Sequence, residues 1–173
     1  SPAAKKLHQA YMGGLAEHTV NVANLCETLC QIHPQINRDF LICTALLHDI
    51  GKIEEYQLNG TIEYTDKGKL IGHIIIGTEM IQEKVQQISD FPEDLAMMIK
   101  HTILSHHGKF EFGSPKLPSI LPAVALFYAD DTDAKINGLI CLKEKFFLSL
   151  DLRVLVEVLC LKRSADLLIV QVK

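Results

Sequence analysis

Hydrophobic residues recur at helical spacing through most of the 173-residue chain. Over residues 15–32 they lie three or four positions apart, and Pro34 ends the pattern, so we expect a first helix there. Asn37 is a favourable N-cap for a second helix, with Gly51 as its C-terminal stop and the His-Asp pair before it in the last turn. A third helical pattern covers residues 70–88 despite two internal glycines, which indicates close packing against a neighbour.

Two more helices are expected in the following region. Pro92 and Glu93 mark the start of a fourth helix, and Gly108 closes it. Residues 110–122 contain several prolines and are expected to form a loop. A fifth helical pattern then runs over residues 121–140.

Between the second and third helices the pattern changes. Residues 53–66 hold two short strand-like runs on either side of Asn59-Gly60, a pair typical of a tight hairpin turn. The chain is therefore predicted to be an all-α helical bundle with a small β-hairpin excursion near residues 56–64.

The end of the chain is more apolar than the rest. Twenty-two of residues 139–173 are apolar, against 48% of the whole chain. Alternate residues from 148 to 158 are apolar, as in a strand, yet the same stretch also fits a helix, which its context favours slightly. We interpret residues 1–138 as one domain and residues 139–173 as a hydrophobic C-terminal extension packed on the same domain.

Composition limits the class of protein. The length suits one globular domain, and 17 Lys and Arg against 21 Asp and Glu give a net charge of -4, so no overall basic field attracts nucleic acid. No apolar run approaches the ~18 residues that span a bilayer, and the start lacks a signal-peptide pattern, so no membrane association is expected. The five cysteines form no CxxC pair. Reduced, buried thiols in a soluble cytoplasmic protein are the prediction.

Histidines and aspartates stand at corresponding places on the predicted helices. His18 falls on the apolar face of the first helix and His106 on that of the fourth, so both are expected to point into the bundle. Each His-Asp or His-His pair alone is expected by chance, but burying many imidazoles and carboxylates is costly unless they are paired or bind metal. The set comprises His18, His48, Asp49, His73, His106, His107 and Asp130.

Taken together, this set indicates a metal centre. A hydrogen-bonded core histidine is the ordinary explanation for each residue alone, whereas inward-facing His and acidic side chains on facing helices hold metal pairs in helical bundles. Imidazole with carboxylate suits transition metals better than Mg or Ca. We predict one or two divalent transition-metal ions, Mn by preference, with Fe, Co, Ni or Zn as alternatives.

The order of these residues resembles the HD superfamily of metal-dependent phosphohydrolases. The combined motifs are most similar to the HD domain of YhaM-type 3′-to-5′ exoribonucleases, over residues 1–138. The segments that carry the similarity are SPAAKKLHQAYMGGLAEHT (1–19), LLHDIGK (46–52), GHIIIGTEM (72–80), LSHHGKFEFGSP (104–115) and ADDTDAKI (129–136). Members of that family usually carry an OB-fold domain before the HD domain. The start SPAAKK, without Met, leaves open that such a domain lies upstream in a longer parent chain.

The resemblance implies two groups of metal ligands. Those around the first ion are His18, His48, Asp49 and Asp130. Those around the second are His73, His106 and His107, with Asp49 bridging the two ions. Asp131 competes with Asp130, which is preferred because its distance from Ala134 matches the D-x-x-D-A spacing of the family.

Asp49 and Lys52 are the expected catalytic residues. Lys52 follows the His-Asp pair closely enough to neutralise a substrate phosphate, although a solvated surface lysine is an equally good interpretation. Lys109 and Lys116 could follow a nucleic-acid backbone, but solvated loop charges explain them better.

The leading hypothesis is a metal-dependent phosphodiesterase that hydrolyses RNA from the 3′ end with a metal-activated water. An HD hydrolase acting on small nucleotides, such as a nucleotidase or a cyclic-nucleotide phosphodiesterase, is the alternative, and the acidic balance favours it. A nucleic-acid-binding regulatory module with a structural metal is a third. Oligomeric state stays open.

Overall fold

The computed structural model describes most of the 173 residues. The described residues are 1–2, 11, 13–58 and 60–147. The chain divides into two units, residues 1–137 and residues 138–173, and the last helix runs across the division. The predictions for the apolar tail beyond residue 147 lie outside the described residues, as do those for residues 3–10 and Asn59. The division into a domain and a packed extension stays a prediction.

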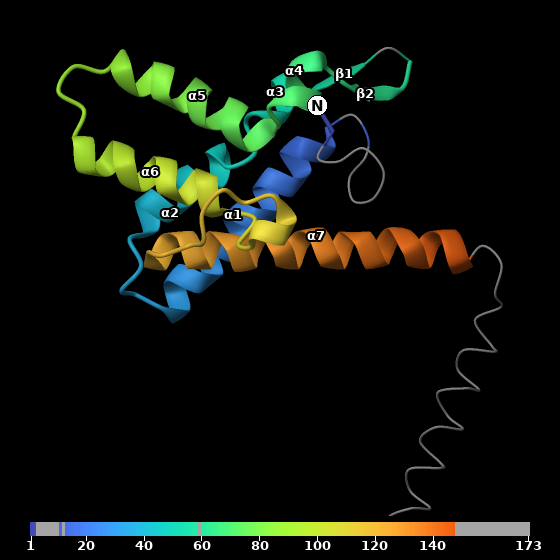
Figure 1. The fold of residues 1–173 in the computed structure, drawn as a ribbon. Helices are drawn as coiled ribbons and strands as arrows, with labels where there is room; N and C mark the ends of the chain where they lie inside the picture. Colours follow the sequence, from blue (N-terminus) through green and yellow to red (C-terminus); the bar gives the residue numbers. More distant parts are fainter. Residues whose placement is uncertain (3–10, 12, 59, 148–173) are drawn as a thin grey trace, which may run out of the picture. The chain divides into compact units, whose positions relative to one another are not determined.

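Helices dominate the described residues, and one two-stranded sheet interrupts them (Figure 1). The elements are α1 (Gly14–Ile32), α2 (Arg38–Leu47), α3 (Lys52–Glu55), β1 (Tyr56–Leu58), β2 (Ile62–Tyr64), α4 (Asp66–Leu70), α5 (His73–Gln86), α6 (Glu93–Ser105), a 3-10 turn η1 (Phe110–Phe112) and α7 (Leu121–Phe147). The predicted fold class, a helical bundle with a small hairpin, is confirmed.

The hairpin lies where the strand-like pattern predicts it. Strands β1 and β2 pair antiparallel, with Tyr56 opposite Tyr64 and Leu58 opposite Ile62. The two tyrosine rings stack across the pair with their centroids 5.0 Å apart. Gly60 in the turn has φ 79°, a conformation that glycine adopts without steric cost.

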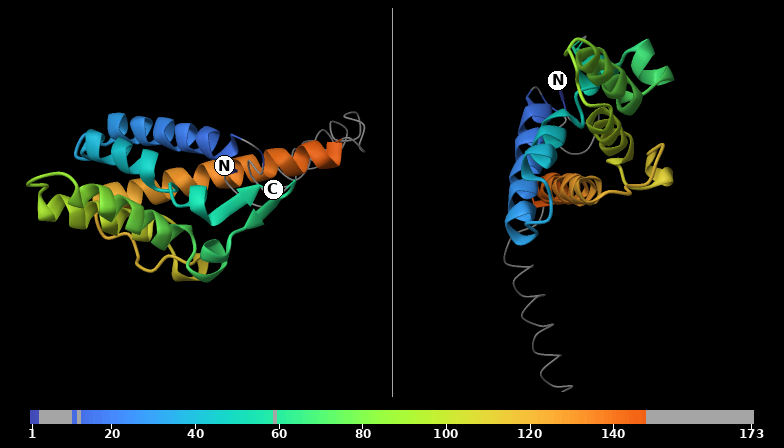
Figure 2. Two further views of the ribbon diagram at one scale, coloured as in Figure 1. Left: turned by 90° about the horizontal axis from the view of Figure 1, so that it is seen from above. Right: turned by 90° about the vertical axis from the view of Figure 1, so that its left-hand side faces the viewer.

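Two apolar clusters form the core, and α2 contributes to both. On one side, Leu41 and Ala45 pack with Val22 of α1 and Leu126 of α7. On the other side, Phe40 packs with residues of α5 and α6, which run alongside each other in opposite directions (Figure 1). The second view in Figure 2 shows the described start of α7 beside α1 and α2. Helix α2 therefore lies between the two halves of the bundle.

Several of the predicted helix boundaries are wrong, and one of them is the end of the fifth helix, which continues past residue 140 to Phe147. The second helix ends at Leu47, and Gly51 has helical angles of φ -62° and ψ -20°, so it caps the start of α3 instead of stopping α2. The third predicted helix, over residues 70–88, begins later than expected, at His73, because Gly72 takes φ 80° and ψ 154° and separates α5 from the short α4, which ends at Leu70. These glycines turn the chain, and the hydrophobic spacing on either side does not reveal it.

Of the two internal glycines predicted to pack closely, Gly77 does so and Gly72 does not: a Cβ on Gly77 would lie 3.2 Å from the backbone nitrogen of Gly51, whereas a Cβ on Gly72 would meet nothing within 4 Å. A Cβ on Gly51 would lie 2.1 Å from the carbonyl oxygen of His73 and 2.6 Å from the backbone nitrogen of Gly77. The absence of both side chains lets the turn after α2 touch the first turn of α5. This contact brings the His-Asp pair next to His73.

Other expectations concern the cysteines and the membrane. The four described cysteines are free thiols, but only Cys26 is buried and Cys43 is exposed, so the prediction of buried thiols is wrong for Cys43. Within the described part of the chain, we find no helix with the length and apolar character needed to cross a membrane.

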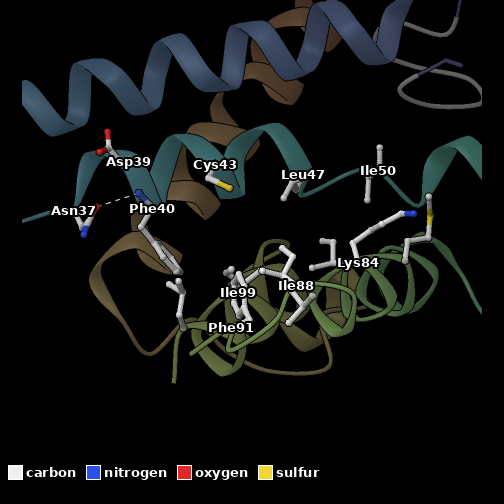
Figure 3. A pocket seen from close by; sticks show the side chains of 14 residues that line it. Asn37, Asp39, Phe40, Cys43, Leu47, Ile50, Lys84, Ile88, Phe91 and Ile99 are labelled. Carbon is white, nitrogen blue, oxygen red and sulfur yellow. Dashed lines mark hydrogen bonds between the residues drawn. The ribbon is translucent and has the colours of Figure 1, made fainter. Parts of the chain in front are cut away.

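An apolar groove of about 730 Å³ runs between α2 and the α5–α6 pair (Figure 3). Its lining includes Phe40, Leu47, Ile81, Ile88 and Ile99. It contains none of the seven predicted metal ligands, so it is separate from the polar site described next.

Candidate metal centre

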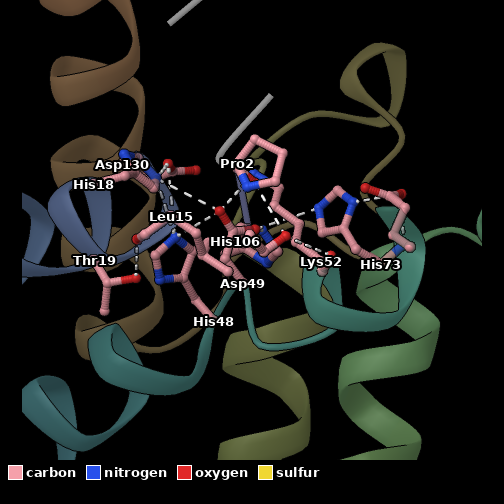
Figure 4. A network of polar contacts seen from close by, with 12 residues as sticks. Pro2, Leu15, His18, Thr19, His48, Asp49, Lys52, His73, His106 and Asp130 are labelled. Carbon is pink, nitrogen blue, oxygen red and sulfur yellow. Dashed lines mark hydrogen bonds and ion pairs between the residues drawn. The ribbon is translucent and has the colours of Figure 1, made fainter. Parts of the chain in front are cut away.

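The seven predicted ligands come from five places in the chain and gather at the C-terminal end of α2. His18 lies in the second turn of α1 and Asp130 in α7, while His48 and Asp49 follow α2 directly. On the other side, His73 is the first residue of α5, and the His106-His107 pair follows α6. Figure 4 shows His18 and Asp130 on one side of Asp49 and His73 on the other.

The first group faces one oxygen of Asp49. His18 Nε2 lies 3.6 Å from Asp49 Oδ2, and His48 Nε2 lies 3.4 Å from the same atom. The two Nε2 atoms are 3.4 Å apart. Asp130 Oδ1 completes the group at 3.0 Å from His18 Nε2 and 3.9 Å from His48 Nε2. The ligand atoms of His18, His48 and Asp49 all lie within 4.8 Å of one another, close enough to bind one ion.

The second group faces the other oxygen of Asp49. His73 Nε2 lies 3.4 Å from Asp49 Oδ1, and His106 Nε2 lies 3.6 Å from it. His107 Nε2 is 3.3 Å from His73 Nε2. These four residues also offer ligand atoms within 4.8 Å of one another. Because Asp49 presents Oδ2 to the first group and Oδ1 to the second, its carboxylate spans the two.

In each of the five histidines of the site, the ring nitrogen Nδ1 already has a hydrogen-bond partner. Three of the Nδ1 atoms bond to backbone carbonyl oxygens, which can only accept, so these imidazoles carry their proton on Nδ1 when neutral and present a bare Nε2. The partners are Ala45 O for His48 (2.7 Å), Ile103 O for His106 (2.6 Å) and Phe112 O for His107 (2.8 Å). His18 Nδ1 lies 2.6 Å from Asp133 Oδ2, and His73 Nδ1 lies 3.0 Å from Glu55 Oε1.

Two atoms that face the interior of the site have no partner among the described residues. His106 and Asp49 are 0% and 2% exposed, yet His106 Nε2 and Asp49 Oδ1 have no hydrogen-bond partner among the described residues. Buried polar atoms without partners cost about 1–3 kcal/mol each. Imidazole nitrogens and carboxylate oxygens that converge in this way suit a divalent transition metal, so the residues fit the ions that the sequence implies.

The pKa values show how charge is arranged around the first group. Burial raises the pKa of Asp49, but the charges of Lys52 and then His48 outweigh it and hold that pKa well below its usual range. Burial lowers the pKa of His18, but hydrogen bonds to Asp130 and Asp133 raise it to about 9. Without metal, His18 therefore carries a proton beside Asp49 and Asp130, whose lowered pKa values keep them ionised.

The second group behaves differently. Burial, followed by the charges of His106 and His73, lowers the pKa of His107 to about 4. Burial also lowers the pKa of His106. These two imidazoles are therefore neutral near pH 7 and can accept a cation without releasing a proton.

Lys52 has a buried position beside the two groups. Its side chain is 9% exposed, and Nζ donates to Asp49 Oδ2 at 2.5 Å. The sequence places Lys52 toward a substrate phosphate or toward bulk solvent. Its burial excludes the solvated interpretation, and its contact with Asp49 gives it a role in orienting that carboxylate.

A model of the HD domain matches residues 15–135, which is most of the chain. The chain belongs to the HD-domain family. A protein named 3'-5' exoribonuclease YhaM from Bacillus licheniformis is 40% identical over 136 residues, and proteins of the same name from Bacillus subtilis and Shouchella clausii are 39% and 42% identical over 136 and 139 residues. Each alignment covers 79% of this chain but 43% of the relative, so the chain spans less than half the length of these relatives. No solved structure matches the chain.

Within this HD domain, Asp130 and Asp131 point to different surroundings. Asp130 lies against the first group, whereas Asp131 Oδ2 accepts a hydrogen bond from Lys135 at 2.7 Å. Lys109 and Lys116 are both exposed, and Lys109 Nζ lies 3.5 Å from Glu111 Oε1.

Sequence reasoning missed two carboxylates that support the candidate ligands His18 and His73. Asp133 is 6% exposed, and its Oδ2 contacts Nδ1 of His18. Its other oxygen, Oδ1, accepts a hydrogen bond from the Asn137 side chain at 2.8 Å. Glu55 Oε1 binds both the backbone N–H of His73 at 2.9 Å and its imidazole. Asp133 had a signal in the sequence, since it lies one helical turn after Asp130. Glu55 had none, because only the fold brings α3 next to α5.

Proposed function

We propose that this HD domain is a metal-dependent phosphodiesterase that hydrolyses RNA from its 3′ end. One observation carries the proposal: two groups of imidazoles turn their Nε2 atoms toward the two oxygens of one buried aspartate. The relatives named 3'-5' exoribonuclease YhaM share about 40% identity with it, which favours RNA as the substrate. The proposed ligands are His18, His48, Asp49 and Asp130 for one ion, and His73, His106 and His107 with Asp49 for the other.

The proposed chemistry divides between the ions and the chain. Bound divalent ions, Mn by preference, supply Lewis acidity toward a phosphoryl group and lower the pKa of water. Asp49 would offer one carboxylate oxygen to each ligand group, so that ions held by the two groups would act on the same substrate phosphate. Hydrolysis then adds water across one P–O bond, leaving a phosphate on one product and a hydroxyl on the other.

Lys52 has two proposed roles in this reaction. Its bond to Asp49 Oδ2 keeps the carboxylate ionised and oriented. Its two remaining N–H bonds are available for a phosphate oxygen, where charge grows as the reaction proceeds. Substituting Lys52 by Met is therefore expected to lower kcat on any phosphodiester by about 10²-fold or more.

The test uses metal-loaded protein and single-stranded RNA labelled at either end. With Mn²⁺ we expect a 5′-labelled RNA to shorten stepwise from the other end, and a 3′-labelled RNA to release its label at once as a mononucleotide. His48→Ala is expected to abolish this activity. His33→Ala, which removes an exposed histidine at the end of α1, is the matched control and is expected to leave it intact.

Two results would contradict the proposal in different ways. Intact RNA together with cleavage of a mononucleotide ester or a cyclic nucleotide would identify a small-nucleotide hydrolase. Bound metal without turnover on any phosphate ester would identify a regulatory module with a structural metal.

A further inference from the structure

Two phenylalanine rings lie exposed next to the candidate metal centre. Phe110 is 65% exposed and Phe112 is 47% exposed, and both belong to the η1 turn that follows His107. Single exposed apolar side chains are ordinary on protein surfaces. Two exposed aromatic rings within three residues, beside a set of candidate metal ligands, are less ordinary and indicate a functional role.

The backbone that carries these rings is anchored on both sides. Before the turn, Gly108 has φ 74° and is packed so tightly that a Cβ would come within 2.2 Å of the Phe127 ring. After the turn, Ser114 is 3% exposed, and its hydroxyl donates to the carbonyl oxygen of Leu104 at 3.0 Å. The rings are thus presented to solvent from a fixed backbone, which reduces the ordering cost of binding.

The turn is joined directly to the second ligand group. The carbonyl oxygen of Phe112 accepts the Nδ1 hydrogen bond of His107 at 2.8 Å. The His73 side chain beside it is 14% exposed, whereas His48 and His106 are fully buried. Solvent therefore reaches the ligands partly from this side, and a substrate phosphate that enters here has its neighbouring nucleotides next to η1.

A cation accompanies the rings. Lys109 Nζ lies 5.1 Å from the centroid of the Phe112 ring and is 55% exposed on its side chain. Proteins that bind single-stranded nucleic acid combine exposed aromatic rings, on which bases stack, with cations that contact the backbone. The η1 turn offers both next to one ligand group.

We propose that η1 is a stacking platform for the bases of single-stranded RNA near its 3′ end, with Phe110 and Phe112 as the stacking rings and Lys109 contacting a phosphate. This inference rests on the proposed function and adds how the substrate is held. Two rings can engage two successive bases, so the platform favours a polymer over a mononucleotide.

The test compares KM and kcat on a single-stranded oligoribonucleotide with Mn²⁺-loaded protein. The variant Phe110→Leu/Phe112→Leu keeps apolar side chains of similar size but removes the aromatic faces. We expect its KM to rise about tenfold or more, because stacking strengthens binding by that order for each base, while kcat falls much less. Phe110→Trp/Phe112→Trp is expected to restore a low KM. Ile88→Ala removes an exposed apolar residue beyond the far end of α5 and is the control without effect.

A second substrate isolates the stacking contact. An oligoribonucleotide without bases at its last nucleotides is expected to raise the KM of the unchanged protein about tenfold, but to add no further loss in the double leucine variant. If the double variant does not fold, the single variant Phe110→Leu takes its place. Among the described residues, Phe112 is hydrogen-bonded to His107, whereas no hydrogen bond links Phe110 to a candidate metal ligand.

The outcomes separate the two proposals. An unchanged KM in the leucine variants, or an equal loss on the abasic substrate in all variants, overturns the stacking platform while RNA hydrolysis stands. If the unchanged protein cleaves small esters but leaves RNA intact, the proposed function is wrong and the platform falls with it.

Discussion

At the scale of single residues, the outer partners of the histidines organise the site. Two of these partners are carboxylates: Asp133 holds His18 of the first group, and Glu55 holds His73 of the second. A carboxylate behind a metal-bound imidazole fixes the ring and raises its basicity. The other three histidines rely on backbone carbonyls, which no substitution removes.

Replacing these carboxylates one at a time is expected to lower the affinity for one ion without changing the affinity for the other. Asp133→Asn should lower the affinity of the first group for its ion about 10- to 100-fold, and Glu55→Gln should do the same for the second group. Calorimetric titration of each metal-free variant with Mn²⁺ measures this. Equal weakening of both ions by either variant would contradict the assignment of the carboxylates to separate groups.

The raised pKa of His18 gives the first ion a distinct pH dependence. Without metal, protonated His18 stabilises the fold below its ordinary pKa of 6.5, and this contribution is lost as the pH rises through about 9. A metal must displace that proton, whereas His107, with a pKa of about 4, has none to lose. We expect the rise in Tm caused by Mn²⁺ to grow from pH 6.5 to pH 8.5. A rise that stays constant or shrinks over this range would contradict the account.

Most of the candidate site could be predicted at this scale, for a physical reason. His18 lies on an apolar helix face, and the His-Asp and His-His pairs follow helices with clear hydrophobic stripes, so the sequence indicates where they point. The link from Glu55 to His73 depends on tertiary contact between α3 and α5, which no periodicity encodes. The burial of Lys52 was missed for the same reason.

At the scale of elements, α2 joins the two halves of the bundle. Its residues pack on α1 and α7 on one side and on α5 and α6 on the other. The turn after it holds Asp49 between both ligand groups. The contact of Gly51 with the first turn of α5 sets the distance between this turn and His73. The sequence predicts the helices but not this junction, because Gly51 resembles a helix stop and acts as a packing contact.

Gly51→Ala is expected to disturb this junction. The new Cβ would overlap the backbone of His73, and overpacking of this kind costs about 1–3 kcal/mol or more in the free energy of unfolding. Urea unfolding of the metal-free protein measures the cost. Gly138→Ala is the matched control: a Cβ there meets nothing within 4 Å, and alanine in a helix gains about 1 kcal/mol over glycine. Equal stability of the two variants would show that the junction is not tightly packed.

At the scale of the whole molecule, the charge balance changes meaning. The chain has a formal net charge of -4, which argues against attraction of polyanions by the protein surface as a whole. Asp49 is buried and Asp130 is partly buried, and both stay ionised; divalent ions bound beside them would concentrate positive charge at one place. Under the proposed function, this local positive charge is what would attract a phosphate ester to an acidic HD domain.

Metal stoichiometry tests the central claim most directly. After reconstitution with Mn²⁺ and removal of free metal, elemental analysis should find about two equivalents in the unchanged protein and in His33→Ala, as proposed for the two ligand groups. His48→Ala should lose the first ion only, and Asp49→Ala should lose both, because Asp49 alone faces both groups. Less than one equivalent in the unchanged protein, with no change in either variant, would contradict the account.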